Sequence, residues 1–323
     1  MTRVLINGFG RIGRTALRAW MSGKWPGIDI VGINDIAAPD LCAHLFAYDS
    51  VFGPYPGRAE LDGDMLVIDD RRFPLYRTPD IGTLDLSLVD IVMECTGKAD
   101  TRDIAERGLG AGAGGILISG PSAAADLTMV LGANDHLLAN QPIVSNASCT
   151  TNALAPLVRL LDDTWGVQTG WMTTIHCYTG SQPTIDAPRG DMQRSRAAGL
   201  SMVPTTTSAQ RLLEEVLPDL AGRIEAAAVR VPTASVSAID LTVTLDARPD
   251  LTAVHDLFRA QQGVIGCTDK PLVSSDLRAR SESLIVALPE TRVTAGGLVR
   301  VFGWYDNEWG FSCRMLDVAQ RMS

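Results

Sequence analysis

Short hydrophobic runs alternate with helical stretches along the first half of the chain. Each run is typical of a buried strand, and the runs lie at residues 4–6, 28–33, 91–93, 116–118 and 143–144. The stretch from Arg11 to Met21, between the first two runs, is predicted to be a helix. Strands that alternate with helices favour a parallel sheet covered by helices, so we expect an α/β fold for this half.

Longer hydrophobic runs with fewer helices occupy the second half. Runs of strand character lie at residues 171–175, 226–231, 238–245 and 299–304, and helices are predicted at 208–216 and 252–262. This pattern predicts an α+β unit with a mixed, mostly antiparallel sheet and helices on one face. We place the domain boundary after residue 148, so that the domains are 1–148 and 149–306, with the terminal helix 307–323 joined to the first domain.

Composition and charge narrow the class of protein. The chain has 323 residues, 46% hydrophobic and 20% charged, as in ordinary globular enzymes with room for two cores. A net charge of −9 argues against nucleic-acid or membrane-surface partners, although Arg189, Arg194 and Arg196 form one candidate basic patch. No apolar stretch approaches the roughly 20 residues that span a bilayer, and the N-terminus lacks a signal pattern. We therefore expect a cytoplasmic protein.

A glycine motif, G-x-G-x-x-G, follows the first predicted strand and opens the first predicted helix. Its glycines are Gly8, Gly10 and Gly13, and they permit a tight turn and close approach of a pyrophosphate to the helix N-terminus. Asp35 ends the next predicted strand, 22 residues after Gly13, where a carboxylate would bind a ribose 2′-hydroxyl and repel a 2′-phosphate. The alternative for Asp35 is a turn or cap residue. The motif predicts NAD as the cofactor.

Cys149 lies where a predicted strand meets a predicted helix. It belongs to the segment Ser145 to Asn152, whose small polar residues cap the helix that follows. The positive end of the helix dipole and the unpaired N–H groups favour the thiolate, which is the nucleophilic form. A buried core cysteine is the alternative, but the polar surroundings favour a nucleophile. The six cysteines of the chain show no paired spacing, which predicts free thiols and no metal site.

His176 is the candidate base among the four histidines. It ends the predicted strand 171–175 and opens into the polar loop 178–182, a position typical of active-site groups, although a structural histidine is an equal alternative there. The other histidines lie in predicted helices or a turn: His44, His136 and His255. An imidazolium beside a thiolate would stabilise the ion pair. With a dinucleotide site, such a pair suits aldehyde oxidation through a thiohemiacetal and a thioester.

The second half also carries groups suited to anions. The run Thr205 to Ser208 precedes a predicted helix, and Arg230 lies inside a predicted strand. Simple helix capping and a structural ion pair are the alternatives. Two anion sites near a thioester would suit a phosphorylated substrate that inorganic phosphate attacks. Asn307, within the aromatic segment 304–310, could donate a hydrogen bond to a carboxamide.

These residues together resemble the phosphorylating, NAD-dependent glyceraldehyde-3-phosphate dehydrogenase family over essentially the whole chain. The resemblance rests on segments 6–14, 33–35, 94–98, 145–152, 229–233 and 304–310. It implies the glycolytic reaction, in which NAD oxidises glyceraldehyde 3-phosphate and inorganic phosphate captures the product as 1,3-bisphosphoglycerate. Cys149 is implied to be the nucleophile and His176 its partner. It also implies a homotetramer, in which the loop 178–201 packs near neighbouring subunits.

The resemblance assigns binding roles to further residues of this chain. The residues implied to contact NAD are Arg11, Ile12, Asp35, Thr96, Ser119 and Asn307. Those implied to surround the attacking phosphate are Ser148, Thr150, Thr207 and Ser208, and those implied to hold the substrate phosphate are Thr179 and Arg230.

Three positions depart from the family pattern. Ser181 stands where the family has aspartate, Ser208 where it has glycine, and Ala153 where it has a second cysteine. The first two keep a rival open: a relative that uses erythrose 4-phosphate or another phosphorylated aldehyde and hydrolyses the thioester. A non-catalytic binding or regulatory homologue is the other alternative, against which the intact Cys149 and His176 argue. The absence of a cysteine at position 153 predicts that oxidised Cys149 needs an external thiol for rescue.

Overall fold

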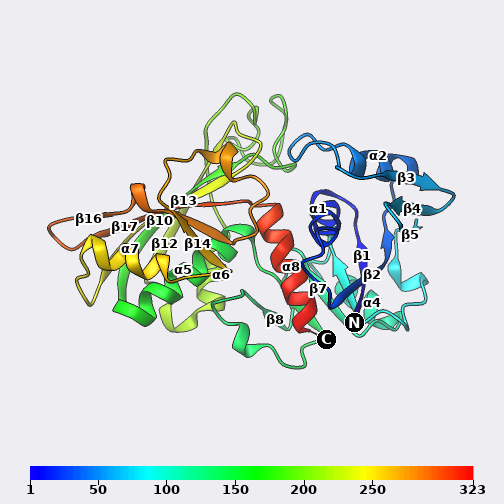
Figure 1. The fold of residues 1–323 in the computed structure, drawn as a ribbon, viewed down its shortest axis with the longest axis horizontal. Coiled ribbons are helices and arrows are strands. Elements are labelled where there is room, and N and C mark those ends of the chain that lie inside the picture. The colour runs from blue at the N-terminus through cyan, green and yellow to red at the C-terminus, as the bar shows by residue number, and fades with distance from the viewer. Residues whose placement is uncertain (323) are drawn as a thin grey trace. The chain divides into compact units, whose positions relative to one another are not determined.

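The computed structural model describes residues 1–322 of the chain (Figure 1). The backbone contacts divide it into two compact units, of which the first comprises Met1–Met129, Asp135–Ala147 and Phe311–Ser323, and the second comprises Val130–Asn134 and Ser148–Gly310. The short segment Val130–Asn134 was expected in the first domain, whereas its backbone contacts place it in the second unit. Its Gly132 packs against Pro156 and Val264 of the second unit, since a Cβ there would lie 3.4 Å and 3.6 Å from their side chains.

The first unit is built on a nine-stranded sheet of order β3-β4-β5-β2-β1-β6-β7-β9-β8. Its strands are β1 (Thr2–Asn7), β2 (Ile28–Asn34), β3 (Ala59–Asp62), β4 (Met65–Ile68), β5 (Arg71–Tyr76), β6 (Ile91–Glu94), β7 (Gly115–Ile118), β8 (Leu127–Thr128) and β9 (Ile143–Ser145). All pairs are parallel except β3–β4 and β4–β5. The predicted parallel sheet is confirmed.

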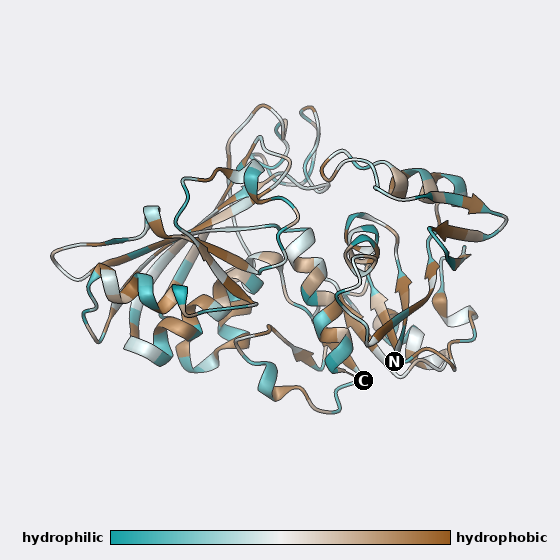
Figure 2. Cartoon of the chain, in the orientation of Figure 1, coloured by the Kyte–Doolittle hydropathy of each residue, from teal (hydrophilic) through white to brown (hydrophobic). Residues whose placement is uncertain are grey.

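Helices flank this sheet and include the one that was expected after the glycine motif. They are α1 (Arg11–Trp20), α2 (Pro39–Ala47), α3 (Arg102–Ala105), α4 (Arg107–Gly110) and most of α8 (Trp309–Arg321), with 3-10 turns η1 (Ile81–Thr83) and η2 (Asp135–Leu137). The central strands are almost wholly hydrophobic because both faces of the sheet are covered (Figure 2).

Buried polar residues mark the carboxyl ends of the central parallel strands. Asn7 ends β1 and is paired in register with Asn34 of β2 and Glu94 of β6. All three are less than a tenth exposed. Because parallel strands end at the same edge, the sheet gathers these polar groups beside the glycine motif that follows β1.

The second unit contains an eight-stranded mixed sheet of order β11-β12-β10-β13-β17-β15-β14, with β16 paired to β17. The strands are β10 (Val167–Cys177), β11 (Val203–Thr205), β12 (Ile224–Val231), β13 (Ser237–Leu245), β14 (Ile265–Thr268), β15 (Leu284–Ala287), β16 (Arg292–Val293) and β17 (Val299–Tyr305). Only β10–β12 and β14–β15 are parallel pairs. The predicted mixed, mostly antiparallel sheet is therefore confirmed.

One helix of the second unit carries Cys149 at its first position. The helices are α5 (Cys149–Trp165), α6 (Ala209–Val216) and α7 (Leu251–Arg259), with 3-10 turns η3 (Pro218–Leu220), η4 (Ser274–Leu277) and η5 (Leu288–Glu290). Helix α5 packs on β10, β13, β15 and β17. Its buried side is the predicted one, with Leu154, Leu157, Val158 and Leu161 all fully buried.

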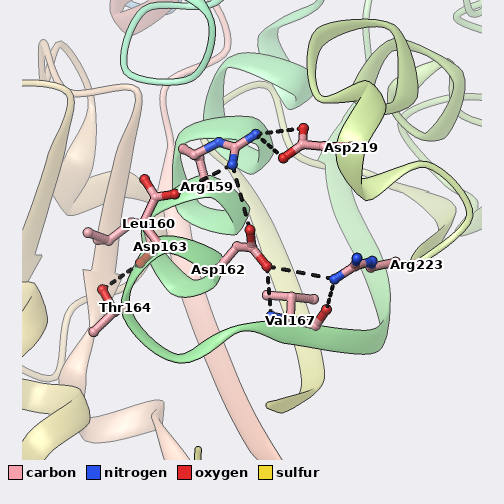
Figure 3. Close-up of polar contacts among 8 residues, drawn as sticks. All are labelled: Arg159, Leu160, Asp162, Asp163, Thr164, Val167, Asp219 and Arg223. Carbon is pink, nitrogen blue, oxygen red and sulfur yellow. Dashed lines mark hydrogen bonds and ion pairs between the residues drawn. The ribbon is translucent and has the colours of Figure 1, made fainter. Parts of the chain in front are cut away.

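An ion-pair network fastens the far end of α5 (Figure 3). Arg159 donates hydrogen bonds to both carboxylate oxygens of Asp219, at 2.8 Å and 2.9 Å, and lies 3.6 Å from Asp162. Asp162 accepts a hydrogen bond from the backbone N–H of Val167 at 2.8 Å, and Arg223 donates to the carbonyl of Val167 at 2.7 Å. The network therefore ties α5 to the start of β10 and to the turn η3.

Within residues 1–322, no helix combines the length and the apolar character needed to cross a membrane.

Candidate active site

Cys149 is the first residue of α5, directly after the residue that caps this helix. The hydroxyl of Ser148 accepts a hydrogen bond from the backbone N–H of Thr151 at 3.0 Å, as an N-cap residue does. Cys149 as a whole residue is partly exposed, in contrast to the fully buried residues one and two turns further along the helix. Cys149 therefore lies at the start of a capped helix, as the sequence predicts.

His176 faces Cys149 from the neighbouring sheet. The Nε2 atom of His176 lies 3.6 Å from the Sγ atom of Cys149. The sequence predicts that His176 ends a strand, and β10 ends one residue later, at Cys177. The strand extends further than expected because β10 pairs on both sides, with β12 up to Cys177 and with β13.

The other ring nitrogen of His176 has two neighbours. Its Nδ1 atom lies 2.7 Å from the backbone carbonyl of Cys177 and 2.6 Å from Nη1 of Arg230, which is the register partner of His176 on β12. An Nδ1 that carries hydrogen donates to the carbonyl, whereas an Nδ1 without hydrogen accepts from the arginine. Only the first tautomer leaves Nε2 free to accept the thiol proton.

Burial controls the protonation of both groups. It raises the pKa of the Cys149 thiol, although the Arg230 cation and hydrogen bonds from Thr150 and the backbone lower it. Burial and the Arg230 cation lower the pKa of His176 to about 4. The expected thiolate–imidazolium pair is thus disfavoured in the free protein. Burial destabilises both charges, and this penalty is larger than the stabilisation that the helix N-terminus gives to the thiolate. The imidazole is therefore unprotonated and can accept the thiol proton, although its lowered pKa makes it a weaker base than a solvent-exposed histidine.

A cavity of about 660 Å³ opens beside Cys149 and His176. Three arginines contribute to its lining, namely Arg189, Arg194 and Arg230, and none of its described lining residues is a carboxylate. The other lining residues expected from the sequence are Ser148, Thr150, Thr207 and Ser208. Such a cavity favours a ligand with more than one anionic group.

Of Thr179 and Ser208, two residues expected around the phosphates, only Ser208 lines the cavity. Thr179 does not line the cavity, but its hydroxyl lies 2.9 Å from the hydroxyl of Ser181, which does. Ser208 precedes α6 without capping it, because Thr207 accepts the hydrogen bond from the N–H of Ala209 at 3.1 Å instead. The hydroxyl of Ser208 is therefore not used by the helix.

A second cavity, of about 300 Å³, lies in the first unit at the carboxyl ends of its parallel strands. Gly8, Gly10, Asp35 and Thr96 line it. Gly8 has a φ of +94°, and a Cβ there would lie 2.7 Å from the backbone of Cys95. A Cβ at Gly10 would meet no atom within 4 Å, so the backbone is open to a ligand on that side. This cradle fits a pyrophosphate that approaches the start of α1.

Asp35 is fixed by backbone hydrogen bonds at the edge of this cavity. One carboxylate oxygen accepts from the N–H of Phe9 at 2.6 Å and the other from the N–H of Ala37 at 2.8 Å. A carboxylate has about four acceptor positions, so two of them are left for a ligand hydroxyl. The remaining residues expected to contact NAD in this unit do not line the cavity: Arg11, Ile12 and Gly13 form the first turn of α1, and Ser119 follows β7.

Comparison with known proteins shows which family the chain belongs to. Residues 148–307 match the model for the C-terminal domain of glyceraldehyde 3-phosphate dehydrogenase, and residues 2–102 match the model for its NAD binding domain. The chain is 45% identical over 330 residues to a glyceraldehyde-3-phosphate dehydrogenase of Xanthobacter flavus, covering 99% of this chain and 98% of that protein. It is 43% identical over 328 residues to one of Cereibacter sphaeroides, with the same coverage. The chain belongs to the glyceraldehyde 3-phosphate dehydrogenase family.

The predicted resemblance and the predicted class of enzyme, a phosphorylating aldehyde oxidoreductase with an NAD-binding domain, are confirmed by these matches. In this dehydrogenase, three residues that the sequence did not assign to the site contact candidate site residues. They are Arg194 and Tyr305 in the second unit and Glu94 in the first.

Arg194 was noticed in the sequence only as part of a basic patch. Its Nε donates to the hydroxyl of Thr205 at 2.5 Å, and one Nη donates to the hydroxyl of Thr206 at 2.6 Å, so the guanidinium lies at the threonine run. Arg196 differs, because it pairs with Asp186 at 2.8 Å and does not line the cavity. The only signal in the sequence was an arginine shortly before the run of hydroxyl residues.

Tyr305 belongs to the aromatic segment 304–310, and nothing in the sequence assigns it a role in the site. Its buried hydroxyl lies 2.9 Å from that of Thr150 and 2.8 Å from that of Thr174, and its ring stands edge-on to His176 at 5.9 Å. It thereby links the start of α5 to β10, next to both catalytic candidates. A buried tyrosine hydroxyl usually has a partner, but the sequence does not show which one.

Glu94 is a buried carboxylate that lines the cofactor cavity. It accepts hydrogen bonds from the backbone N–H of Thr96 at 2.9 Å, from the hydroxyl of Thr96 and from the side chain of Asn7. It holds Thr96, a residue expected to contact NAD, at the end of β6.

Proposed function

We propose that this dehydrogenase oxidises glyceraldehyde 3-phosphate with NAD and transfers the acyl group to inorganic phosphate. The product is 1,3-bisphosphoglycerate. The observation that carries the proposal is the distance of 3.6 Å between Cys149 Sγ and His176 Nε2, in a cavity with three arginines and no carboxylate among its described lining residues. A nucleophile, a base and two anion sites are what this reaction requires.

The first step is attack of Cys149 on the aldehyde carbon. The thiol proton passes to Nε2 of His176 as the C–S bond forms, and His176 then gives this proton to the aldehyde oxygen, so that a thiohemiacetal results and Nε2 is free again. His176 then accepts the hydroxyl proton as the hydride leaves the same carbon, so that a thioester is formed on Cys149. Bound NAD supplies the hydride acceptor.

The second step is attack of inorganic phosphate on the thioester. A phosphate oxygen forms the bond to the acyl carbon, the C–S bond breaks, and the sulfur recovers its proton from His176. We assign the attacking phosphate to Ser148, Thr150, Thr207 and Ser208, together with Arg194. We assign the substrate phosphate to Thr179 and Arg230. The Ser181 hydroxyl, 2.9 Å from that of Thr179, belongs to the same group.

NAD is the proposed cofactor in preference to NADP. The proposed contacts are the glycines Gly8, Gly10 and Gly13, and Arg11, Ile12, Asp35, Thr96, Ser119 and Asn307. Asp35 supports the choice, because a carboxylate at the ribose would attract a 2′-hydroxyl and repel a 2′-phosphate.

An Asp35→Ala variant tests this choice. We expect the ratio of kcat/KM for NAD to that for NADP to fall at least about tenfold, the effect of losing one charge-assisted hydrogen bond and one repulsion. Glu60→Ala, an exposed carboxylate of β3, is the control and should leave the ratio unchanged. An unaltered ratio in the Asp35 variant would argue against the ribose contact.

The proposed assembly is a cytoplasmic homotetramer whose first unit binds NAD and whose second unit is catalytic. Large hydrophobic side chains of the second unit are exposed in the single chain. Trp171 on β10 is 52% exposed, and Ile185, Met192 and Leu200 of the loop 178–201 are 77%, 93% and 85% exposed. Apolar surface of this kind is typical of an interface between subunits. Sedimentation of the purified protein tests the subunit number.

Steady-state kinetics with two aldehydes separates this function from its rival. Glyceraldehyde 3-phosphate and erythrose 4-phosphate are compared with and without inorganic phosphate. We expect sustained NADH formation only with phosphate present, and faster turnover of the three-carbon substrate. Turnover that continues without phosphate would show hydrolysis of the thioester and overturn the proposal.

A further inference from the structure

Three neighbouring strands of the second sheet bring Cys177, Ser237 and Asn307 together. Cys177 ends β10, Ser237 begins β13, and Asn307 follows the end of β17. These strands are adjacent in the order β10-β13-β17, and Ser237 is the register partner of Tyr305, two residues before Asn307. Cys177 and Ser237 are fully buried, and Asn307 is 7% exposed.

Two donors converge on the side-chain oxygen of Asn307. The thiol of Cys177 donates to Oδ1 at 3.1 Å, and the hydroxyl of Ser237 donates to the same oxygen at 3.3 Å. The hydroxyl of Ser237 in turn accepts the backbone N–H of Cys177 at 3.1 Å, which directs its own hydrogen toward Asn307. Both acceptor positions of Oδ1 are therefore occupied.

The nitrogen of the same amide is left available. No described residue accepts a hydrogen bond from Nδ2 of Asn307. Nδ2 is also not one of the fully buried atoms that lack a partner, so it is accessible to a ligand. An amide that is anchored through its oxygen can present only its two N–H donors to a ligand. Burial raises the pKa of Cys177 to about 12, which keeps its thiol protonated and able to donate.

We infer that Cys177 and Ser237 are positioning residues, which hold Asn307 so that its Nδ2 donates to the carbonyl oxygen of the nicotinamide carboxamide. The inference rests on the proposed function, which assigns Asn307 to NAD. Besides burial, the charges of Cys149 and Arg230 act on the pKa of the Cys177 thiol, so the anchored amide lies near the residues that handle the reacting carbon. A nicotinamide ring that takes hydride from that carbon must present its carboxamide in this neighbourhood.

Alanine and serine variants test the inference through cofactor binding. Cys177→Ala and Ser237→Ala each remove one donor to Oδ1, and we expect each to weaken NAD binding about fivefold, as measured by calorimetry, the equivalent of one neutral hydrogen bond. The KM for the aldehyde should not change. Cys177→Ser keeps a donor and should restore NAD affinity. Ser283→Ala is the matched control, because its buried hydroxyl has no partner among the described residues.

Two cofactor analogues test which end of the amide is presented. The 3-acetylpyridine analogue keeps the carbonyl oxygen but lacks the carboxamide N–H groups, whereas the thionicotinamide analogue replaces that oxygen with a weakly accepting sulfur. We expect the wild type to bind the acetyl analogue more tightly than the thio analogue, relative to NAD, and expect the difference to shrink when both Cys177 and Ser237 are alanine.

The reverse order of analogues, or NAD affinity that is unchanged in both single alanine variants, would overturn the inference. Failure of the wild type to oxidise glyceraldehyde 3-phosphate would instead overturn the proposed function. Because the dissociation constants are measured without the aldehyde, the two failures are distinguishable.

Discussion

At Cys149, two opposing effects act on the thiol proton. Burial raises the pKa of the thiol, whereas the Arg230 cation and the hydrogen bonds at the helix start lower it, and burial is the larger effect. The sulfur therefore needs a base when it attacks. The Nε2 atom of His176 is 3.6 Å away, and a histidine whose pKa is lowered to about 4 is uncharged at neutral pH.

The influence of Arg230 on Cys149 can be measured by alkylation. Arg230→Gln removes the cation that lowers the pKa of the thiol, so we expect the midpoint of iodoacetamide labelling to move to higher pH. Arg189→Gln is the control, since Arg189 lines the same cavity but does not contribute to the shift. Equal midpoints in the wild type and the Arg230 variant would contradict this electrostatic role.

The sequence located candidate site residues well where the signal was local. Cys149 and its cap Ser148 are adjacent in sequence, and the glycine motif lies within six residues of the chain, so both could be found without a structure. Arg194 and Tyr305 could not, because each contacts its partners only after the chain has folded back over many residues. The thiol's raised pKa was missed for the same reason, since burial is a property of the whole unit.

At the scale of elements, helix α5 is held at both ends. Ser148 caps its start beside the nucleophile, and the network around Arg159 fastens its end to the turn η3 and the start of β10 (Figure 3). A helix that is fixed at both termini keeps its first residue in place, which is the requirement for a positioned nucleophile.

Loss of Arg159 should weaken this attachment. We expect Arg159→Ala to lower the free energy of unfolding by about 1 kcal/mol at neutral pH and low salt, whereas Arg211→Ala, which breaks an exposed pair with Glu215, should cost roughly 0.3 kcal/mol. Urea unfolding of both variants measures the difference. An equal cost in the two variants would show that the network adds nothing beyond a surface pair.

The same pair gives a pH dependence of known sign. The hydrogen bond from Arg159 lowers the pKa of Asp219 in the folded chain. Its contribution is therefore complete above the ordinary aspartate pKa of about 4 and is lost as the pH falls through the lower folded value. We expect the wild type and Arg159→Ala to approach equal stability in acid. A difference that grows as the pH falls would have the wrong sign.

Strand and helix types were largely predictable, and their ends were less so. The hydrophobic runs indicated most interior strands of both sheets, but not β4, β5 or β15. Strand β10 starts four residues before the predicted run 171–175 and ends one residue after His176, because its outer residues are held by pairing with β12 and β13 and not by their own side-chain pattern. The unexpected membership of Val130–Asn134 in the second unit likewise depends on packing around Gly132.

At the scale of the whole molecule, the six cysteines are all free, and Cys149 is the one that lines the cavity of the second unit. Cys42, Cys177 and Cys313 are buried, and the thiol of Cys149 opens into the cavity of the second unit. Ala153, where the family has a second cysteine, lies one helical turn beyond Cys149 and is fully buried. Oxidised Cys149 therefore has no neighbouring thiol on its own helix.

This arrangement predicts how the protein recovers from oxidation. After mild peroxide treatment, we expect activity to return only when an external thiol is added, and mass mapping to find Cys149 without an intrachain disulfide. The Ala153→Cys variant should form a disulfide with Cys149 across one helical turn. An intrachain disulfide to Cys149 in the wild type would contradict the prediction.

The most direct test of the whole account is a single turnover without inorganic phosphate. The protein is mixed with NAD and glyceraldehyde 3-phosphate, NADH is measured, and the acyl group is located by mass mapping. We predict a burst of NADH that is stoichiometric with the protein and then stops, an acyl group on Cys149, and renewed NADH formation when phosphate is added; Cys149→Ser should give no burst. Steady NADH formation without phosphate, or an acyl group on any other residue, would contradict the account.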